Sequence, residues 1–167
     1  MTSKALAEEY MRPLNTELVM DALRYNGIEA TSEDGQVFFD YCGEHHSIVT
    51  SRLPMIHLAK TYSVKGVDFE AMKITASQMA DEVVMAKAIV DEEDSDITFY
   101  LVSVENNVGH FRSALPRYLE ILNTAVSTHR DFYDKLVPDS GSDDAEDVSS
   151  KAVEPEIQSQ DHKQLVS

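Results

Sequence analysis

The spacing of apolar residues changes several times along this chain, and each change predicts a switch between helix and strand. Apolar positions recur every three or four residues between Asn15 and Asn26, as on the buried face of a helix. Asn15 or Thr16 can cap the start of this helix, and Gly27 can end it. From Ile28 onward the apolar positions alternate, which is typical of strands.

Short turns separate the strand-like runs, so we expect an antiparallel meander. The first four runs cover residues 28–32, 36–42, 47–53 and 55–64. Asp68 can cap a second helix, and an acidic turn at 91–96 joins two further strands at 83–90 and 97–104. A long stripe of apolar residues predicts a last helix over 107–136, with a kink or short break near Ser113 because Pro116 lies inside it.

These elements predict an α+β fold in the order α-β-β-β-β-α-β-β-α. The sheet is expected to have five or six antiparallel strands, with three helices packed mainly on one face. The domain should cover residues 15–137, after a flexible lead-in at 1–14 with at most a helical turn around 5–11. Residues 138–167 carry many acids and few apolar side chains, so we expect a disordered acidic tail.

Three helices cannot cover both faces of such a sheet, and both faces carry apolar residues. In the strand from Gln36, Val37 and Phe39 alternate with Phe38, and near the end of the domain Phe99 and Leu101 alternate with Tyr100 and Val102. We expect Phe38, Tyr100 and Val102 to lie on the uncovered face and to bind a partner subunit or an extended peptide. The alternative is that a loop or the N-terminal segment covers this face.

Composition narrows the range of partners. The chain has 167 residues, with 14 Lys and Arg against 30 Asp and Glu, a net charge of -16. Such a charge disfavours nucleic acid and anionic membranes and favours basic partners. The chain shows neither a signal peptide nor an apolar stretch of the roughly 20 residues that cross a bilayer. The single cysteine, Cys42, excludes an intrachain disulfide, so we expect a cytoplasmic protein.

Cys42, His45 and His46, with His57 further on, form the most suggestive chemical cluster, because sulfur and imidazole bind zinc or copper. Adjacent histidines on a strand point to opposite faces, however, and no second cysteine completes a tetrahedral site. Cys42 is expected to be a small buried residue. No nucleophile, phosphate-binding or calcium-binding motif is present, so we assign no catalytic, metal-binding or cofactor-binding residue and expect a protein that is not an enzyme.

The element order, with the segments LVMDALRYNGIEATSEDGQVFFDY and DITFYLVSVENNVGHFRSALPRYLEIL, resembles the YbjN-type family of bacterial proteins described as candidate sensory transduction regulators. That family is similar in fold to the class I chaperones of type III secretion. The resemblance implies a cytoplasmic, dimeric, chaperone-like or regulatory protein that holds another polypeptide. A small-ligand or metal-binding sensor or enzyme, with a pocket near Cys42 and His45/His46, is the main alternative. A third is a structural domain whose acidic tail recruits a basic partner.

Overall fold

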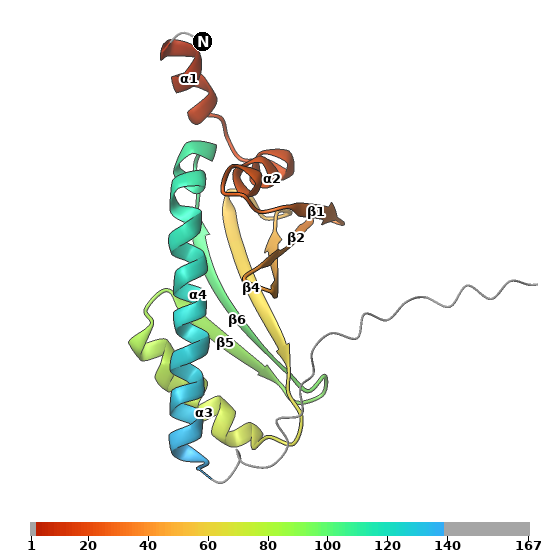
Figure 1. The fold of residues 1–167 in the computed structure, drawn as a ribbon, viewed down its shortest axis with the longest axis vertical. Helices are drawn as coiled ribbons and strands as arrows, with labels where there is room; N and C mark the ends of the chain where they lie inside the picture. Colours follow the sequence, from red (N-terminus) through yellow and green to blue (C-terminus); the bar gives the residue numbers. More distant parts are fainter. Residues whose placement is uncertain (1–2, 139–167) are drawn as a thin grey trace, which may run out of the picture.

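The structure is a computed structural model that describes residues 3–138 (Figure 1). This part of the chain contains six antiparallel strands and four α-helices. This confirms the predicted α+β class, with one helix more than expected. The elements in chain order are α1 (Ser3–Tyr10), α2 (Thr16–Tyr25), β1 (Ala30–Glu33), β2 (Gln36–Tyr41), β3 (Glu44–Val49), β4 (Met55–Ser63), α3 (Phe69–Glu82), β5 (Ala86–Asp91), β6 (Asp96–Val104) and α4 (Val108–Leu136). The predicted acidic tail lies outside the described residues.

The sheet has the strand order β1-β2-β3-β4-β6-β5. Strands β1 to β4 form the predicted meander, and β6 then pairs with β4 along nine residues, from Met55 opposite Val104 to Ser63 opposite Asp96. Strand β5 closes the sheet as its far edge. The long β4–β6 pair therefore forms the middle of the domain.

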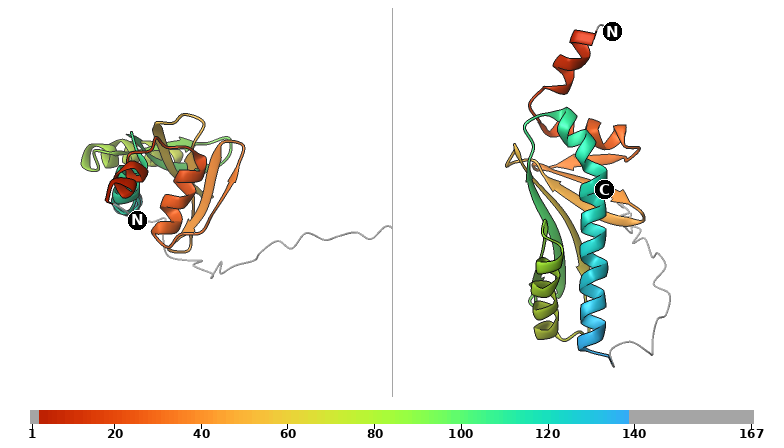
Figure 2. Two further views of the ribbon diagram at one scale, coloured as in Figure 1. Left: turned by 90° about the horizontal axis from the view of Figure 1, so that it is seen from above. Right: turned by 90° about the vertical axis from the view of Figure 1, so that its left-hand side faces the viewer.

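Helices α2, α3 and α4 lie on one face of this sheet. Figure 1 and Figure 2 show α4 running the length of the sheet, with α2 near one end and α3 near the other, while α1 extends beyond the end of α4. The inward side chains of the strands pack against these helices in one continuous core, whose fully buried members include Val37, Ile48, Ile56, Leu58, Leu101, Phe111, Leu115 and Leu122. The opposite face carries no described helix.

Each of the three packed helices begins at a side-chain cap. Asn15 accepts a hydrogen bond from the amide of Leu18 at 2.9 Å, and Asp68 accepts one from the amide of Ala71 at 3.0 Å. Asn107 caps α4 in the same way. These contacts satisfy backbone N–H groups that have no partner inside the helix, so the predicted helix starts are correct.

Two short turns set the register of the first three strands. Asp34 and Gly35 link β1 to β2 with φ values of 47° and 77°, and Cys42 and Gly43 link β2 to β3 with 53° and 78°. Positive φ at both positions suits the right-handed twist of a hairpin. Cys42 is consequently exposed at a turn, and the expectation of a buried cysteine was wrong.

Several predicted boundaries also need correction. Strand β3 begins at Glu44 rather than at 47, because the two-residue turn brings the chain back into the sheet at once. It ends at Val49, where the amides of Thr50 and Ser51 both donate to the carbonyl of Gly35. Strands β1 and β5 each start later than predicted, at Ala30 and Ala86.

Helix α4 is continuous through Pro116, so of the kink or short break predicted near Ser113, the break was wrong. Proline leaves the carbonyl four residues earlier, that of Arg112, without its helical N–H donor. The side-chain amide of Asn26, which follows α2, donates to this carbonyl at 3.2 Å. A tertiary hydrogen bond thus compensates the local defect.

The N-terminal segment docks on α4 and does not cover the open face of the sheet. The amide of Val108 donates to the carbonyl of Arg12 at 3.0 Å, and the ring of Tyr10 lies so close to Gly109 that a Cβ atom there would come within 2.2 Å of it. Arg112 stacks over the rings of Tyr10 and Tyr25. The helix α1, longer than the turn expected around 5–11, is held by these contacts.

Candidate functional site

The uncovered face of the sheet brings together the three residues that the sequence singled out. Phe38 lies opposite Ser47, Ser47 opposite Ala59, and Ala59 opposite Tyr100, so all four belong to one row across the strands. Three strand spacings of about 4.8 Å place the two aromatic residues about 14 Å apart. Two small side chains therefore lie between two aromatic ones.

Val102 belongs to the neighbouring row, opposite His57 on β4. It is 38% exposed, and Val104 and Met55 beyond it are 60% and 40% exposed. The Nε2 atom of His57 is covered but has no hydrogen-bond partner. We name the set Phe38, Ser47, His57, Ala59, Tyr100, Val102 and Val104 the open-face patch.

Charged residues surround the open-face patch, and most of them are acidic. By strand alternation and register, Glu33, Asp40, Asp91 and Asp96 occupy the same face toward its margins, with Lys87 as the basic exception. Beside Phe38 the surface is hollowed by about 290 Å³, and Thr31, Asp40 and His45 contribute to the walls. This hollow thus combines an aromatic ring with a carboxylate.

The alternative site near Cys42 is not assembled. His45 lies on the open side, where its Nδ1 atom is 3.0 Å from Asp40 Oδ1 and its ring stacks on Phe38. His46 is 1% exposed on the helix-covered side, and Cys42 is on the turn. Among residues 3–138 no three His, Cys, Asp or Glu side chains are grouped so that they could hold a metal ion.

A charged cluster that sequence reasoning missed lies between the sheet and α4. Lys60 is 3% exposed, forms an ion pair with Glu44, and donates to Oδ1 of Asn123 at 3.0 Å. The hydroxyl of Tyr62 donates to the other carboxylate oxygen of Glu44 at 2.8 Å. Partial burial alone would raise the pKa of Glu44, but the hydrogen bonds from Lys60 and Tyr62 lower it below its usual value. Burial and the same carboxylate raise the pKa of Tyr62.

His46 continues this cluster on β3. Its Nδ1 atom donates to the carbonyl of Glu44 at 2.8 Å, because a carbonyl can only accept, and Nε2 is left buried without a partner. Burial lowers the pKa of His46, so the ring is neutral near neutral pH. The signal for this cluster was the strict alternation of β4, which places Lys60 on the same side as Ile56 and Leu58.

Glu105, between β6 and α4, is a second buried acid that the sequence did not single out. Its side chain is fully buried and accepts hydrogen bonds from Ser103, Tyr118 and His110. Burial and the bond to Glu105 raise the pKa of the Tyr118 hydroxyl. Because the backbone amide of Glu105 also donates to the carbonyl of Pro54 at 2.9 Å, the cluster fixes the connection from sheet to helix.

None of these clusters places an activated nucleophile beside a substrate-sized opening. Apart from Nε2 of His46, the Lys60 and Glu105 clusters pair their polar groups with one another and join the sheet to α4, which is a structural role. No helix among residues 3–138 is both long enough and apolar enough to span a bilayer. The open-face patch is an apolar surface that no helix among residues 3–138 covers.

Comparisons with known proteins agree at the level of fold. No family model matches the chain, and no curated protein is significantly similar in sequence. The crystal structure of YbjN from E. coli, described as a candidate transcription regulator, superposes with a TM-score of 0.59 at 9% identity, covering 71% of this chain and 93% of that one. An uncharacterized protein from Methanothermobacter thermautotrophicus superposes with a TM-score of 0.52 at 10% identity, covering 74% of this chain and 99% of that one. The chain therefore has the YbjN-type fold that its element order predicted.

Proposed function

We propose that this protein is a non-catalytic interaction module that binds a basic segment of another polypeptide on its open-face patch. One observation carries this proposal: Phe38, Tyr100 and Val102 lie on a sheet face that no described element covers. A contiguous apolar patch rimmed by polar residues is characteristic of a protein-binding surface. The YbjN-type fold, seen in a protein described as a candidate regulator, supports a regulatory use of this surface.

The acidic residues around the open-face patch indicate which kind of partner can bind there. The margins of the patch are mainly acidic, and the whole chain has a net charge of -16. Two copies meeting face to face would bring these acidic margins together, whereas lysine and arginine on a partner would pair with them. A basic segment with apolar side chains is therefore the occupant that fits, and a homodimer formed through this face is the competing outcome.

The hollow beside Phe38 suggests an anchor for such a segment. An arginine that displaces His45 can place its guanidinium over the Phe38 ring and pair with the carboxylate of Asp40. Aromatic and arginine residues seated in pockets carry much of the binding energy in protein interfaces. The sheet would supply the aromatic ring and the acid, and the partner the cation.

The test uses the full-length chain with a photo-crosslinking residue in place of Tyr100, and a matched chain with that residue in place of Ile74. Ile74 is 51% exposed on α3, away from the patch. We expect crosslinks from position 100 to a segment of another protein that carries both basic and apolar side chains. Phe38→Asp should abolish these crosslinks, and added salt should reduce their yield. Crosslinks of equal yield from both positions would contradict the proposal.

Light scattering of the same chain distinguishes a basic partner segment from a second copy of this chain as the occupant of the patch. A monomer in isolation that yields the crosslinks described above supports the proposed partner. A dimer that Tyr100→Asp dissociates would assign the face to a second copy instead and overturn the proposal.

A further inference from the structure

A cavity on the helix-covered side of the sheet is separate from the open-face patch. It lies where α3, α4 and the β4–β6 pair meet, and its volume is about 240 Å³. Met72, Ile97, Phe99 and Val126 form much of its wall. A dry cavity of about 150 Å³ is large enough for benzene, so a substituted aromatic ring fits here by volume.

His129 is a polar residue that lines this cavity, and one of its two ring nitrogens is bonded to α3. Its Nε2 atom lies 3.3 Å from the carbonyl of Met72 and 3.0 Å from the hydroxyl of Thr75, whose own hydrogen is directed at the backbone carbonyls of α3. A carbonyl can only accept, so Nε2 carries the ring hydrogen. In the neutral ring Nδ1 therefore keeps its lone pair, and no residue among 3–138 donates to it.

The protonation state supports this geometry. His129 is 5% exposed, and burial lowers its pKa below that of an ordinary histidine. The ring is therefore neutral near neutral pH, and His129, which lines the cavity, keeps Nδ1 as a hydrogen-bond acceptor. A hydroxyl or N–H group on a bound molecule can donate a hydrogen bond to this nitrogen.

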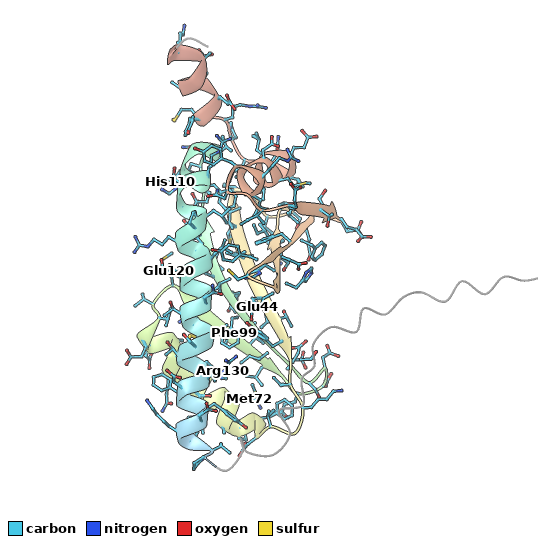
Figure 3. All side chains as sticks on the ribbon, viewed as in Figure 1. Glu44, Met72, Phe99, His110, Glu120 and Arg130 are labelled. Atoms are coloured by element: carbon cyan, nitrogen blue, oxygen red, sulfur yellow. The ribbon has the colours of Figure 1, made fainter. Side chains whose placement is uncertain are left out.

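Arg130 provides a cation at the rim of the same cavity. It is exposed, it lines the cavity, and it has no ion pair within the described part of the chain. Figure 3 labels Arg130, Met72 and Phe99 in the region where α3, α4 and the sheet come together. An unpaired guanidinium beside an apolar cavity suits a carboxylate.

We propose that this cavity binds a small aromatic carboxylic acid that also carries a hydroxyl or N–H donor. The ring packs between Met72 and Phe99, the donor bonds to Nδ1 of His129, and the carboxylate pairs with Arg130. This site would make the protein responsive to a small molecule, and it does not depend on what binds the opposite face of the sheet.

The test is calorimetric titration of the full-length chain with 4-hydroxybenzoate, benzoate and 4-hydroxybenzyl alcohol. We expect saturable binding of 4-hydroxybenzoate with one site per chain, and binding at least about fivefold weaker for the two probes that lack either the hydroxyl or the carboxylate. In nitrogen NMR spectra, the Nδ1 signal of His129 should shift when 4-hydroxybenzoate binds and not with benzoate. Failure of 4-hydroxybenzoate to saturate the protein at millimolar concentration would overturn the proposal.

Two variants locate the site. Val126→Phe should fill the cavity and abolish binding of all three probes. Arg130→Gln, at an exposed position that should not disturb folding, should weaken 4-hydroxybenzoate at least about fivefold and leave the uncharged alcohol unchanged. Arg117→Gln removes the same charge from an exposed position elsewhere on α4 and should change neither affinity. Equal effects of Arg130→Gln and Arg117→Gln would contradict the proposed contact.

Discussion

The two faces of this sheet are built from the same strands by simple alternation, yet they have opposite physical characters. Phe99 and Tyr100 are neighbours in β6, but Phe99 is 2% exposed beneath the helices whereas Tyr100 lies on the open face. The covered face adds two buried charged clusters to a close-packed core. The open face keeps apolar side chains in contact with solvent. The comparison shows that apolar residues in a strand identify two surfaces here, one buried in the core and one that no described helix covers.

The largest expected effect tests this contrast within a single pair of residues. Phe99→Ala should lower the free energy of unfolding by about 3–5 kcal/mol, because it leaves a cavity in the core. Tyr100→Ala should lower it by about 1 kcal/mol or less, because the ring is only partly buried and no described helix covers its face of the sheet. Urea unfolding of the two variants measures both. Similar losses would mean that the open face is also part of the core.

The next effect concerns the ion pair on the covered face. Glu44→Gln should destabilise the protein by about 2 kcal/mol, since it leaves the buried ammonium of Lys60 without its counter-charge. Lys60→Met in the same chain should restore most of that stability, because an apolar side chain needs no counter-charge. A double-mutant cycle by urea unfolding gives the coupling. Additive losses would show that the two side chains do not depend on each other.

Because of its buried histidines, the folded protein should lose stability in mild acid. The pKa values of His46 and His129 are below the ordinary value of 6.5 in the folded chain, so the unfolded chain binds more protons once the pH falls below about 6.5. Stability should decrease as the pH falls from there toward the lowered pKa values, by up to roughly 1.4 kcal/mol per pH unit for each ring. Thermal unfolding between about pH 7.5 and pH 5 measures this slope.

Two substitutions test the histidine assignment. His46→Asn and His129→Gln keep a donor near each hydrogen-bonding nitrogen but do not titrate, so the double variant should show a flatter slope. The lowered pKa of Glu44 adds a further loss only below its usual value of 4.5, which lies outside this window. An unchanged slope in the double variant would assign the acid sensitivity to other groups.

The smallest expected effect is on the open face. Val102→Lys should change the free energy of unfolding by no more than about 0.5 kcal/mol, because the side chain already contacts water. The same substitution should weaken partner binding, since it places a cation where the proposed basic segment docks. Val84→Lys, at an 82% exposed position before β5, is the matched control for both measurements. Strong destabilisation by Val102→Lys alone would indicate an unrecognised cover.

Much of this arrangement could be predicted because it depends on local periodicity. The period of two assigned Phe38, Tyr100 and Val102 to one face, and the caps Asn15 and Asp68 marked helix starts correctly. Long-range contacts were harder to foresee. Pro116 predicted a kink or a short break, and the hydrogen bond from Asn26 to the carbonyl of Arg112, which helps the helix to continue, could not be foreseen from local sequence.

The candidate chemical sites likewise show what local sequence predicts and what depends on long-range contacts. The cluster of Cys42, His45 and His46 is prominent in the sequence, but the turn at Cys42 and the alternation of β3 send these side chains in three directions. The groups that do assemble, such as Lys60 with Glu44, are distant in sequence and carry no motif. Their signal was limited to a charged residue at an inward strand position.

The sequence by itself determined the order of helices and strands, the alternation that gives the sheet two apolar faces, and the acidic character of the chain. These follow from residue type and spacing, which act over a few neighbouring positions. Only the tertiary structure decided which buried charges are paired, how α4 continues through Pro116, and where a cavity remains between α3, α4 and the sheet. Such features depend on how surfaces distant in sequence fit together, and that fit is a property of the packed chain rather than of any one segment.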